Sequence, residues 1–235
     1  MECGRVEKIE DSVMRRIKKF IREHEKLMIF LSFIYRMFAC NRVTGKNGLE
    51  LKWTGTFCKH MKIKNHGKNN KVIIEKGCRF YNCSIEIYGN HNIITIANDC
   101  AGHEFEFWAS DGSKIYVGEH THFAGNTHLA ATEGKTITIG DRCLFASEIV
   151  FRTGDSHSIL DLNGNRLNFA KDITVGNHVW IGQYVTVLKG TQINDDTIVG
   201  TNSLLTGKTF ESNCVVAGNP AKVIKKDVIW HHDLL

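Results

Sequence analysis

The chain has 235 residues, of which 42% are hydrophobic and 23% charged, a composition that suits one or two globular domains with a buried core. Its formal net charge is +5 at pH 7 with histidine neutral, and this mild excess excludes the dense basic surface of a nucleic-acid-binding protein. The 8 cysteines include no CxxC pair and do not suggest a disulfide framework in a chain of this length, so we expect a reducing, cytoplasmic setting.

Residues 1–45 are predicted to form a helical segment that is distinct from the rest of the chain. Apolar side chains recur at near-helical spacing from Ile9 to Phe38, and lysine and arginine side chains cover the other faces. The apolar run LMIFLSFIY is much shorter than the roughly 20 residues that span a bilayer. Three interpretations remain: a helix packed on its own protein or a sister subunit, a peripheral membrane contact through residues 9–38, and a cleaved or lipidated segment ending near Cys40.

A six-residue period begins at about residue 70 and is clearest after Ile139. Large apolar side chains return at every sixth position, and a small or β-branched side chain follows four residues after most of them. The large positions are Ile139, Phe145, Phe151, Val175, Ile181, Val187, Ile193, Val199 and Leu205, and the small ones include Cys143, Val179, Val185, Thr191, Thr197, Ser203 and Thr209. This period is typical of a parallel β-helix. We therefore predict an all-β solenoid over residues 46–225 and a C-terminal tail over 226–235.

The small interior positions also account for several cysteines. Cys78, Cys100 and Cys143 each follow an apolar residue by four positions, so we expect them to be buried as small hydrophobic side chains. Gly, Asn and Asp are expected at the corners, where positive φ angles cost them little.

One segment interrupts the period without shifting its frame. Between Phe151 and Val175 the interior positions fall on His157, Asp161 and Asn163, which cannot fill an apolar core. The sequence therefore predicts a loop that leaves the solenoid over about 157–172 and presents His157, and loops on rigid scaffolds commonly carry function.

The chain resembles the hexapeptide-repeat acyltransferases over roughly residues 72–225. The resemblance is carried by ITVGNHVWIGQYVTVLKGTQINDDTIVGTNSLLTGK, by the ending VVAGNPAKVIKK and by the segment GDSHSILD. Within that family it is similar to the branch that O-acetylates sugars, oligosaccharides and capsular polysaccharides. The resemblance implies a left-handed coil with three units per turn and a homotrimer that binds acetyl-CoA between neighbouring prisms.

His157 matches the family's essential histidine, and its chemistry suits that role. A sugar hydroxyl is a weak nucleophile until its proton is removed, and an imidazole with an ordinary pKa of about 6.5 can remove that proton near neutral pH. Asp155 is a candidate for the acceptor site, and either Asp155 or Asp161 is a candidate to orient the imidazole. Direct transfer to the acceptor needs no covalent acyl-enzyme.

The remaining site residues are implied by the same resemblance. Asn126 matches the acceptor-binding asparagine, and the acidic residue that adjoins it in the family falls on Glu133 or Gly134. The residues that match contacts to acetyl-CoA are Trp180 and Gln183 along the thioester and pantetheine path, Thr201, Thr206 and Lys208 further along, and Lys222 and Lys225 at the coenzyme phosphates.

Other functions were weighed against sugar O-acetylation. An amino-sugar N-acetyltransferase or an antibiotic acetyltransferase would use the same scaffold, and a non-catalytic binding module would lack the donor site. A zinc hydratase of this fold would draw on His120, His122, His128, His157 and His178. However, Asp161 and Leu162 stand where the hydratase pattern needs a second histidine, so no metal is expected.

Overall fold

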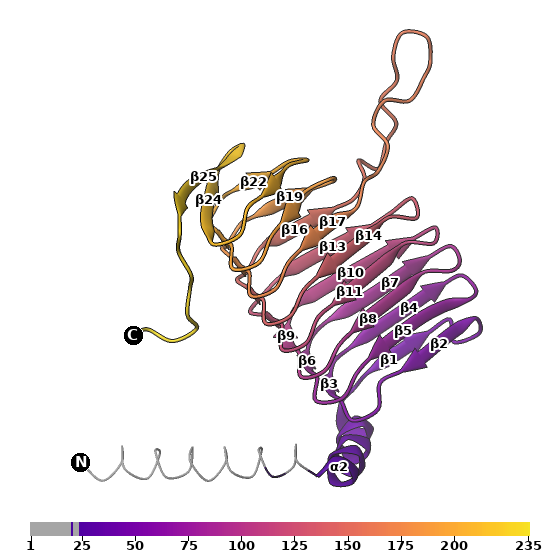
Figure 1. Cartoon of the computed structure of the whole chain (residues 1–235). Coiled ribbons are helices and arrows are strands. Elements are labelled where there is room, and N and C mark those ends of the chain that lie inside the picture. The colour runs from indigo at the N-terminus through magenta and orange to yellow at the C-terminus, as the bar shows by residue number, and fades with distance from the viewer. Residues whose placement is uncertain (1–19, 21–23) are drawn as a thin grey trace.

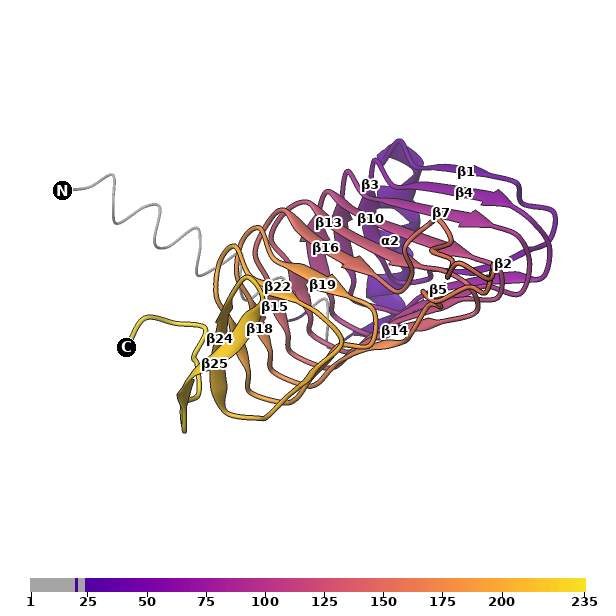
Figure 2. The same ribbon diagram turned by 90° about the horizontal axis from the view of Figure 1, so that it is seen from above.

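The computed structural model describes residue 20 and residues 24–235 and shows a solenoid of three parallel sheets (Figure 1). Each turn of the coil contributes one strand to each sheet, in the order sheet C, sheet A, sheet B along the chain. The turns stack along one axis, with the N-terminal helix at one end and the C-terminal strands at the other (Figure 2). The prediction of a parallel β-helix with an N-terminal helical element is confirmed.

The strands of each sheet follow one another at intervals of one turn. Sheet A contains β1 (Arg42–Thr44), β4 (Lys62–His66), β7 (Ser84–Tyr88), β10 (Phe105–Ser110), β13 (Thr127–Ala131), β16 (Ile149–Arg152), β19 (Thr186–Leu188) and β22 (Leu204–Leu205). Sheet B contains β2 (Leu49–Lys52), β5 (Asn70–Ile74), β8 (Ile93–Ile96), β11 (Lys114–Val117), β14 (Thr136–Ile139), β17 (Ile173–Val175), β20 (Gln192–Ile193) and β23 (Thr209–Phe210).

Sheet C ends in an antiparallel strand. It contains β3 (Phe57–Lys59), β6 (Arg79–Tyr81), β9 (Ala101–His103), β12 (His122–Phe123), β15 (Leu144–Phe145), β18 (Trp180–Ile181), β21 (Ile198–Val199), β24 (Cys214–Gly218) and β25 (Ala221–Lys226). Strand β25 pairs antiparallel with β24, whereas the other strand pairs of this sheet are parallel. The parallel stack therefore ends at β24.

The length of a turn changes along the chain. In the first half Lys62 pairs with Ser84 and Phe105 with Thr127, so one turn takes 22 residues, whereas Thr186 pairs with Leu204 after 18. Only the later turns keep the strict period of six. The sequence repeat was therefore visible from about residue 70, although the first strand, β1, already begins at Arg42.

The predicted interior positions point into the core, with one exception. All the large apolar positions from Ile139 to Leu205 are buried, and so are Cys78, Cys100 and Cys143. Thr209 is exposed and its neighbour Phe210 is buried, so the prediction for Thr209 was wrong. The physical reason is a turn of 17 residues, in which Gln192 pairs with Thr209 and the frame shifts by one.

The corners are held by side chains that reach from one turn to the next. Asp195 accepts a hydrogen bond from the backbone N–H of Asn177 at 2.7 Å, and Asn177 accepts one from the N–H of Asp141 at 2.9 Å. Gly140 precedes this row because a Cβ there would lie 2.7 Å from Oδ1 of Asn177. The Gly-Asx corners thus satisfy backbone donors that strand pairing leaves open.

Helix α2 (Glu25–Phe38) lies against the first turns of the solenoid. The Tyr35 ring meets Phe57 at 5.7 Å, and the Arg36 guanidinium lies 5.3 Å from the centre of the Trp53 ring. Much of its apolar surface is exposed, with Phe30 at 60% and Phe38 at 76%. The predicted helical positions before Phe20 lie outside the described residues. Within the described part of the chain no helix has the length and apolar character needed to span a membrane.

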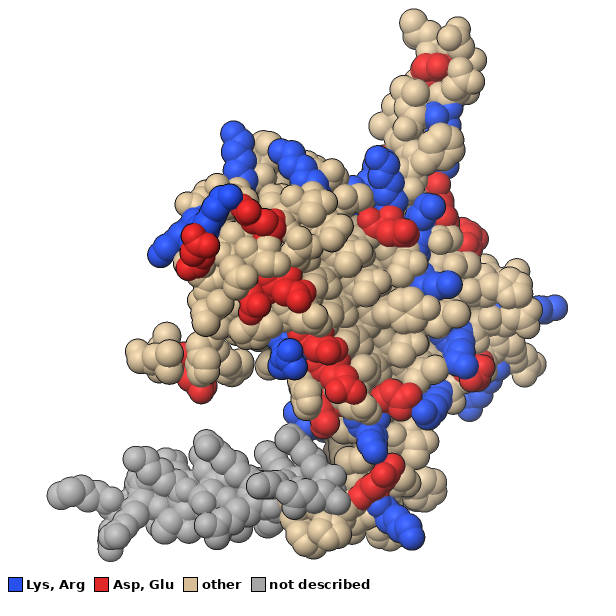
Figure 3. Space-filling view, in the orientation of Figure 1, with Lys and Arg blue, Asp and Glu red and all other residues tan. Residues whose placement is uncertain are grey.

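Acidic and basic side chains are interspersed over the face of the molecule shown in Figure 3, in keeping with the small net charge of +5. None of the seven described cysteines forms a disulfide, and all except Cys40 are buried. Burial raises the pKa of the Cys58 thiol to about 11 and that of Cys143 to about 12. These thiols are therefore protonated packing groups rather than nucleophiles.

Candidate functional site

An arm formed by residues 153–172 leaves the solenoid between β16 and β17 and carries His157 (Figure 1). Its two legs run antiparallel, with a bridge between Leu160 and Arg166 and a 2.8 Å hydrogen bond from the N–H of Leu167 to the carbonyl of Ile159. The predicted departure from the solenoid is therefore present, and it is an ordered hairpin.

The tip of the arm is closed by Asp161. Its Oδ1 accepts the backbone N–H groups of Asn163 and Asn165 at 2.9 and 2.8 Å, and its Oδ2 accepts the Asn165 amide at 2.9 Å. These hydrogen bonds from Asn165 lower the pKa of the Asp161 carboxyl. The carboxylate of Asp161 thus holds the turn, and the prediction that it orients His157 finds no support in this geometry.

The base of the arm is fastened to the next turn of the coil through Asp155. Its Oδ2 accepts hydrogen bonds from Lys189 and from the amide of Asn168, the latter at 2.8 Å. The Lys189 ammonium is the main reason that the pKa of Asp155 is lowered, with Asn168 adding to it. Lys189 also donates to the carbonyl of Asn168 at 3.1 Å.

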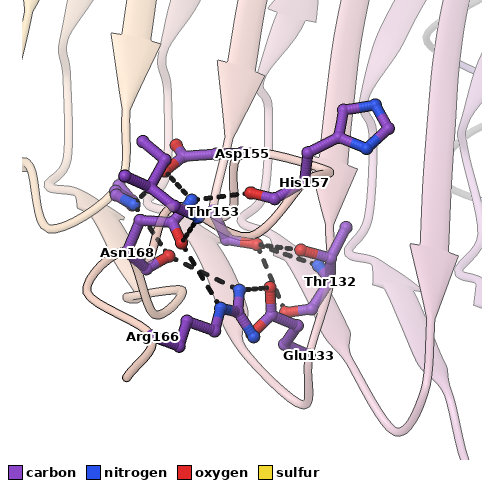
Figure 4. A network of polar contacts seen from close by, with 9 residues as sticks. Thr132, Glu133, Thr153, Asp155, His157, Arg166 and Asn168 are labelled. Carbon is purple, nitrogen blue, oxygen red and sulfur yellow. Dashed lines mark hydrogen bonds and ion pairs between the residues drawn. The ribbon is translucent and has the colours of Figure 1, made fainter. Parts of the chain in front are cut away.

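A second set of contacts fastens the arm to the preceding turn (Figure 4). Arg166 donates to Glu133 at 2.7 Å and lies 5.1 Å from the centre of the Phe169 ring. The Arg166 hydrogen bond lowers the pKa of Glu133. Thr153 Oγ1 accepts the N–H of Thr132 at 2.8 Å. Charged contacts therefore brace the arm from both neighbouring turns.

The backbone of His157 is held while its ring is exposed. Its N–H donates to the carbonyl of Asp155 at 2.8 Å, and its own carbonyl accepts the Asn168 amide at 2.7 Å. Figure 4 shows the imidazole pointing away from this network. Asp155 therefore positions the backbone near His157, and its carboxylate is engaged by Lys189 and Asn168.

The other predicted site residues lie along two different edges of sheet A. The edge shared with sheet C carries Asn126, Gln183 and Thr201, which follow strands β12, β18 and β21. The edge shared with sheet B carries the His157 arm together with Thr206 and Lys208, which lie between β22 and β23. At about 3.3 Å per residue, the five residues of β13 separate the two edges by about 15 Å. One chain therefore does not bring Asn126 and His157 together.

The acidic partner of Asn126 is a residue that the sequence did not indicate. The Asn126 amide donates to Oε2 of Glu148 at 3.1 Å, whereas the predicted candidate Glu133 lies at the other edge and pairs with Arg166. The signal that would have found Glu148 is the 22-residue turn, because Glu148 is one turn after Asn126.

The predicted donor-site residues near the C-terminus lie on sheet C. Trp180 stands on the outer face of β18 with 40% of its surface exposed. Lys222 and Lys225 are exposed on β25, and the neighbouring Lys226 pairs with Glu211 at 2.6 Å. Lys226 is thereby occupied within the chain, in contrast to the two predicted phosphate-binding lysines.

The described residues contain no group of three or more His, Cys, Asp or Glu side chains that could hold a metal ion. Two of the histidines that were weighed as zinc ligands have carboxylate partners: His128 lies 3.2 Å from Glu106, and His178 lies 2.7 Å from Asp196. The geometry of the site is that of an exposed imidazole on a braced arm.

Comparison with known proteins links this geometry to a group of transferases. Residues 172–207 match the family described as bacterial transferase hexapeptide (six repeats). The chain is 35% identical over 165 residues to a polysialic acid O-acetyltransferase of Neisseria meningitidis, an alignment that covers 70% of this chain and 76% of the relative. It is also 35% identical over 123 residues to a polysialic acid O-acetyltransferase of Escherichia coli O1:K1, covering 52% of this chain and 39% of that longer relative.

The structural comparison gives the same result. The crystal structure of the polysialic acid O-acetyltransferase OatWY superposes with a TM-score of 0.76 at 31% identity, covering 83% of this chain and 92% of that one. This match confirms the left-handed parallel β-helix that the sequence predicted. The similarity extends well beyond residues 172–207 and includes the turns that carry Asn126 and His157.

Proposed function

The chain belongs to the hexapeptide-repeat acetyltransferase family, and from that premise we propose that it transfers an acetyl group from acetyl-CoA to a hydroxyl of a sugar or polysaccharide. The observation that carries the proposal is His157, whose ring is exposed at the end of a backbone fixed by Asp155 and Asn168. The relatives that act on polysialic acid support a polymeric sugar as the acceptor.

The proposed reaction is a direct transfer. The imidazole of His157 removes the proton of the acceptor hydroxyl, and the oxygen attacks the thioester carbonyl. The tetrahedral intermediate then collapses, the carbon–sulfur bond breaks, and the imidazolium returns the proton to the leaving thiolate. Because both reactants are bound in one groove, the step is effectively intramolecular.

The bracing of the arm explains why a histidine on a projecting hairpin can serve as a precise base. Lys189 and Arg166 fasten the arm to the turns on both sides, so the His157 backbone does not move freely with the tip. A catalytic group must stay within a fraction of an ångström of its working position. Asp155 contributes to this positioning through its contacts with Lys189 and Asn168, and we keep it as a residue of the acceptor side.

A homotrimer would complete the site. Asn126 with Glu148 lies at one edge of sheet A and His157 at the other, so an acceptor that needs both groups must lie between two prisms. We propose that Asn126 of one copy faces His157 of the next. Gln183 and Thr201 would then lie on one wall of the groove and Thr206 and Lys208 on the facing wall.

The donor is proposed to run along the C-terminal turns. Trp180 would contact the thioester and pantetheine end, and the unpaired cations of Lys222 and Lys225 would meet the phosphates of acetyl-CoA. The buried thiols suit a reducing compartment, and we propose the cytoplasm as the site of the reaction.

A thiol-release assay tests the proposed function. The purified protein is incubated with acetyl-CoA and with acidic polysaccharides, neutral polysaccharides, monosaccharides and amino sugars, and the products are analysed by mass. We expect acceptor-dependent thiol release and a gain of acetyl groups that mild alkali removes, as it removes an O-acetyl ester. An alkali-stable amide product would reassign the protein to N-acetylation, and no acceptor-dependent release from any hydroxyl would contradict the proposal.

A further inference from the structure

The last nine residues, 227–235, lie beyond the final strand, yet they are anchored to the solenoid. The chain turns back after β25 (Figure 1), and the N–H of Val228 donates to the carbonyl of Asn213 at 3.0 Å. Trp230 is only 9% exposed, although its neighbour Ile229 is 73% exposed. A tail that merely trailed in solvent would not bury its largest side chain.

Trp230 is held by His178. Its indole N–H donates to the His178 carbonyl at 2.7 Å, and its ring stacks on the imidazole with a centroid distance of 4.3 Å and an interplanar angle of 12°. The imidazole is itself fixed, because its Nδ1 lies 2.7 Å from Oδ1 of Asp196 on the next turn. The indole therefore has a defined place, fixed by one hydrogen bond and one stacked ring.

This place is next to Trp180. The two indole rings lie 6.0 Å apart between centroids at an angle of 45°, within the range of a favourable aromatic pair. Trp180 projects from β18 only two residues after His178 and remains 40% exposed. Trp230 thus limits Trp180 on one side and leaves the rest of that ring open to a ligand.

We propose that Trp230 is a positioning residue of the donor site, which holds the Trp180 indole in the orientation that receives the pantetheine end of acetyl-CoA. The inference rests on the proposed function, because it takes Trp180 as a contact of acetyl-CoA. An exposed aromatic side chain without a neighbour samples several rotamers, and fixing one of them in advance lowers the entropy cost of binding. The tail thereby becomes part of the donor site.

Calorimetric titration with coenzyme A tests the effect on binding. Trp230→Ala is expected to weaken coenzyme A binding on the order of tenfold, whereas Trp230→Phe, which keeps a ring to stack on His178 but loses the N–H, should weaken it less. Ile229→Ala is the matched control in the same tail and should bind as wild type does. Wild-type affinity in a folded Trp230→Ala protein would overturn the proposal, and so would tighter binding, which would show that the tail competes with the ligand.

A double-mutant cycle shows whether Trp230 acts through Trp180. In a Trp180→Ala background, Trp230→Ala should change coenzyme A affinity by less than twofold, because the ring to be positioned is already gone. The same tenfold loss in both backgrounds would contradict positioning and would assign Trp230 to general stability or to a direct contact. Thermal unfolding of each variant identifies a loss that is due to unfolding.

Fluorescence separates this inference from the proposed function. In a Trp53→Phe, Trp108→Phe background the emission comes from Trp180 and Trp230 alone, and Trp230→Ala should increase the acrylamide quenching of Trp180 without any ligand. If wild type fails to bind coenzyme A, the proposed function fails, while quenching still reports the contact. Unchanged quenching in a folded variant would show that Trp230 does not hold Trp180 and would overturn the inference.

Discussion

Lys189 donates a hydrogen bond to the Asp155 carboxylate and so ties the turn that contains β19 to the base of the arm that carries His157. The same ammonium donates to the carbonyl of Asn168, whose amide holds the His157 carbonyl. The position of the proposed base is therefore set by a cation 32 residues further along the chain.

Removing this cation is expected to slow the chemical step. Lys189→Met should lower kcat by about 10- to 100-fold, because a small displacement of the base is costly to proton transfer. Coenzyme A affinity should stay close to that of wild type. Steady-state kinetics and calorimetry measure the two effects, with Lys171→Met as the control at the same edge, since Lys171 is exposed. A kcat equal to that of wild type would show that the ion pair does not position His157.

The braces of the arm should fail only in acid. Lys189 lowers the pKa of Asp155 and Arg166 lowers that of Glu133, so each carboxylate stabilises the arm above its ordinary pKa of about 4 and loses this effect as pH falls through the lowered value. Hydrogen exchange at the Ile159 and Leu167 amides, corrected for the intrinsic rate, should be constant between about pH 5 and 8 and should accelerate below about pH 4. Loss of protection between pH 5 and 7 would contradict this assignment.

The interior register makes a prediction for stability. Val199 is 1% exposed, so Val199→Asp places an unpaired carboxylate in the core and should cost about 4 kcal/mol or more, enough to unfold or aggregate the chain. Asp195→Asn should change the melting temperature little, because Asn keeps an oxygen that accepts the Asn177 N–H. Solubility and thermal unfolding check both variants. A soluble, native-like Val199→Asp protein would mean that the inward register is wrong.

The later turns could be predicted from sequence because their period is strict. Residues from Ile139 to Leu205 recur every six positions, and the insertion that carries His157 keeps the frame, so the arm was recognisable as polar residues in apolar positions. The early turns were harder, since a 22-residue turn is not a multiple of six. The slip at Thr209 had no signal beyond the extra residue in TGK.

The site was predictable in its residue types and not in its contacts. Hydrogen bonds such as Asn126 to Glu148 and Lys189 to Asp155 join residues on neighbouring turns, and their partners depend on the length of each turn. Trp230 lies outside the repeat, so no periodic argument could place it beside His178. Local sequence patterns indicate the scaffold, whereas the contacts between turns are fixed by the register of the coil.

The basic pair on β25 makes a prediction for donor binding. Lys222→Glu with Lys225→Glu should raise the KM for acetyl-CoA at least tenfold while kcat at saturation changes little, because contacts to the phosphates are equal in the ground and transition states. The wild-type KM should also rise with salt. Acetyl-pantetheine lacks these phosphates, so the double variant should use it as well as wild type does. An equal loss with both donors would assign the lysines to the fold.

The most direct test of the account compares binding and transfer in a single variant, His157→Ala. The ring is exposed and its backbone hydrogen bonds do not need the side chain, so the variant should fold, assemble and bind coenzyme A as wild type does. Acetyl transfer to the sugar acceptor should fall by about 10²–10⁴-fold, the usual loss when a general base is removed. His103→Ala, which removes an exposed histidine on β9, serves as the control and should keep full activity. Near-wild-type transfer by His157→Ala, with coenzyme A binding intact, would contradict the central claim.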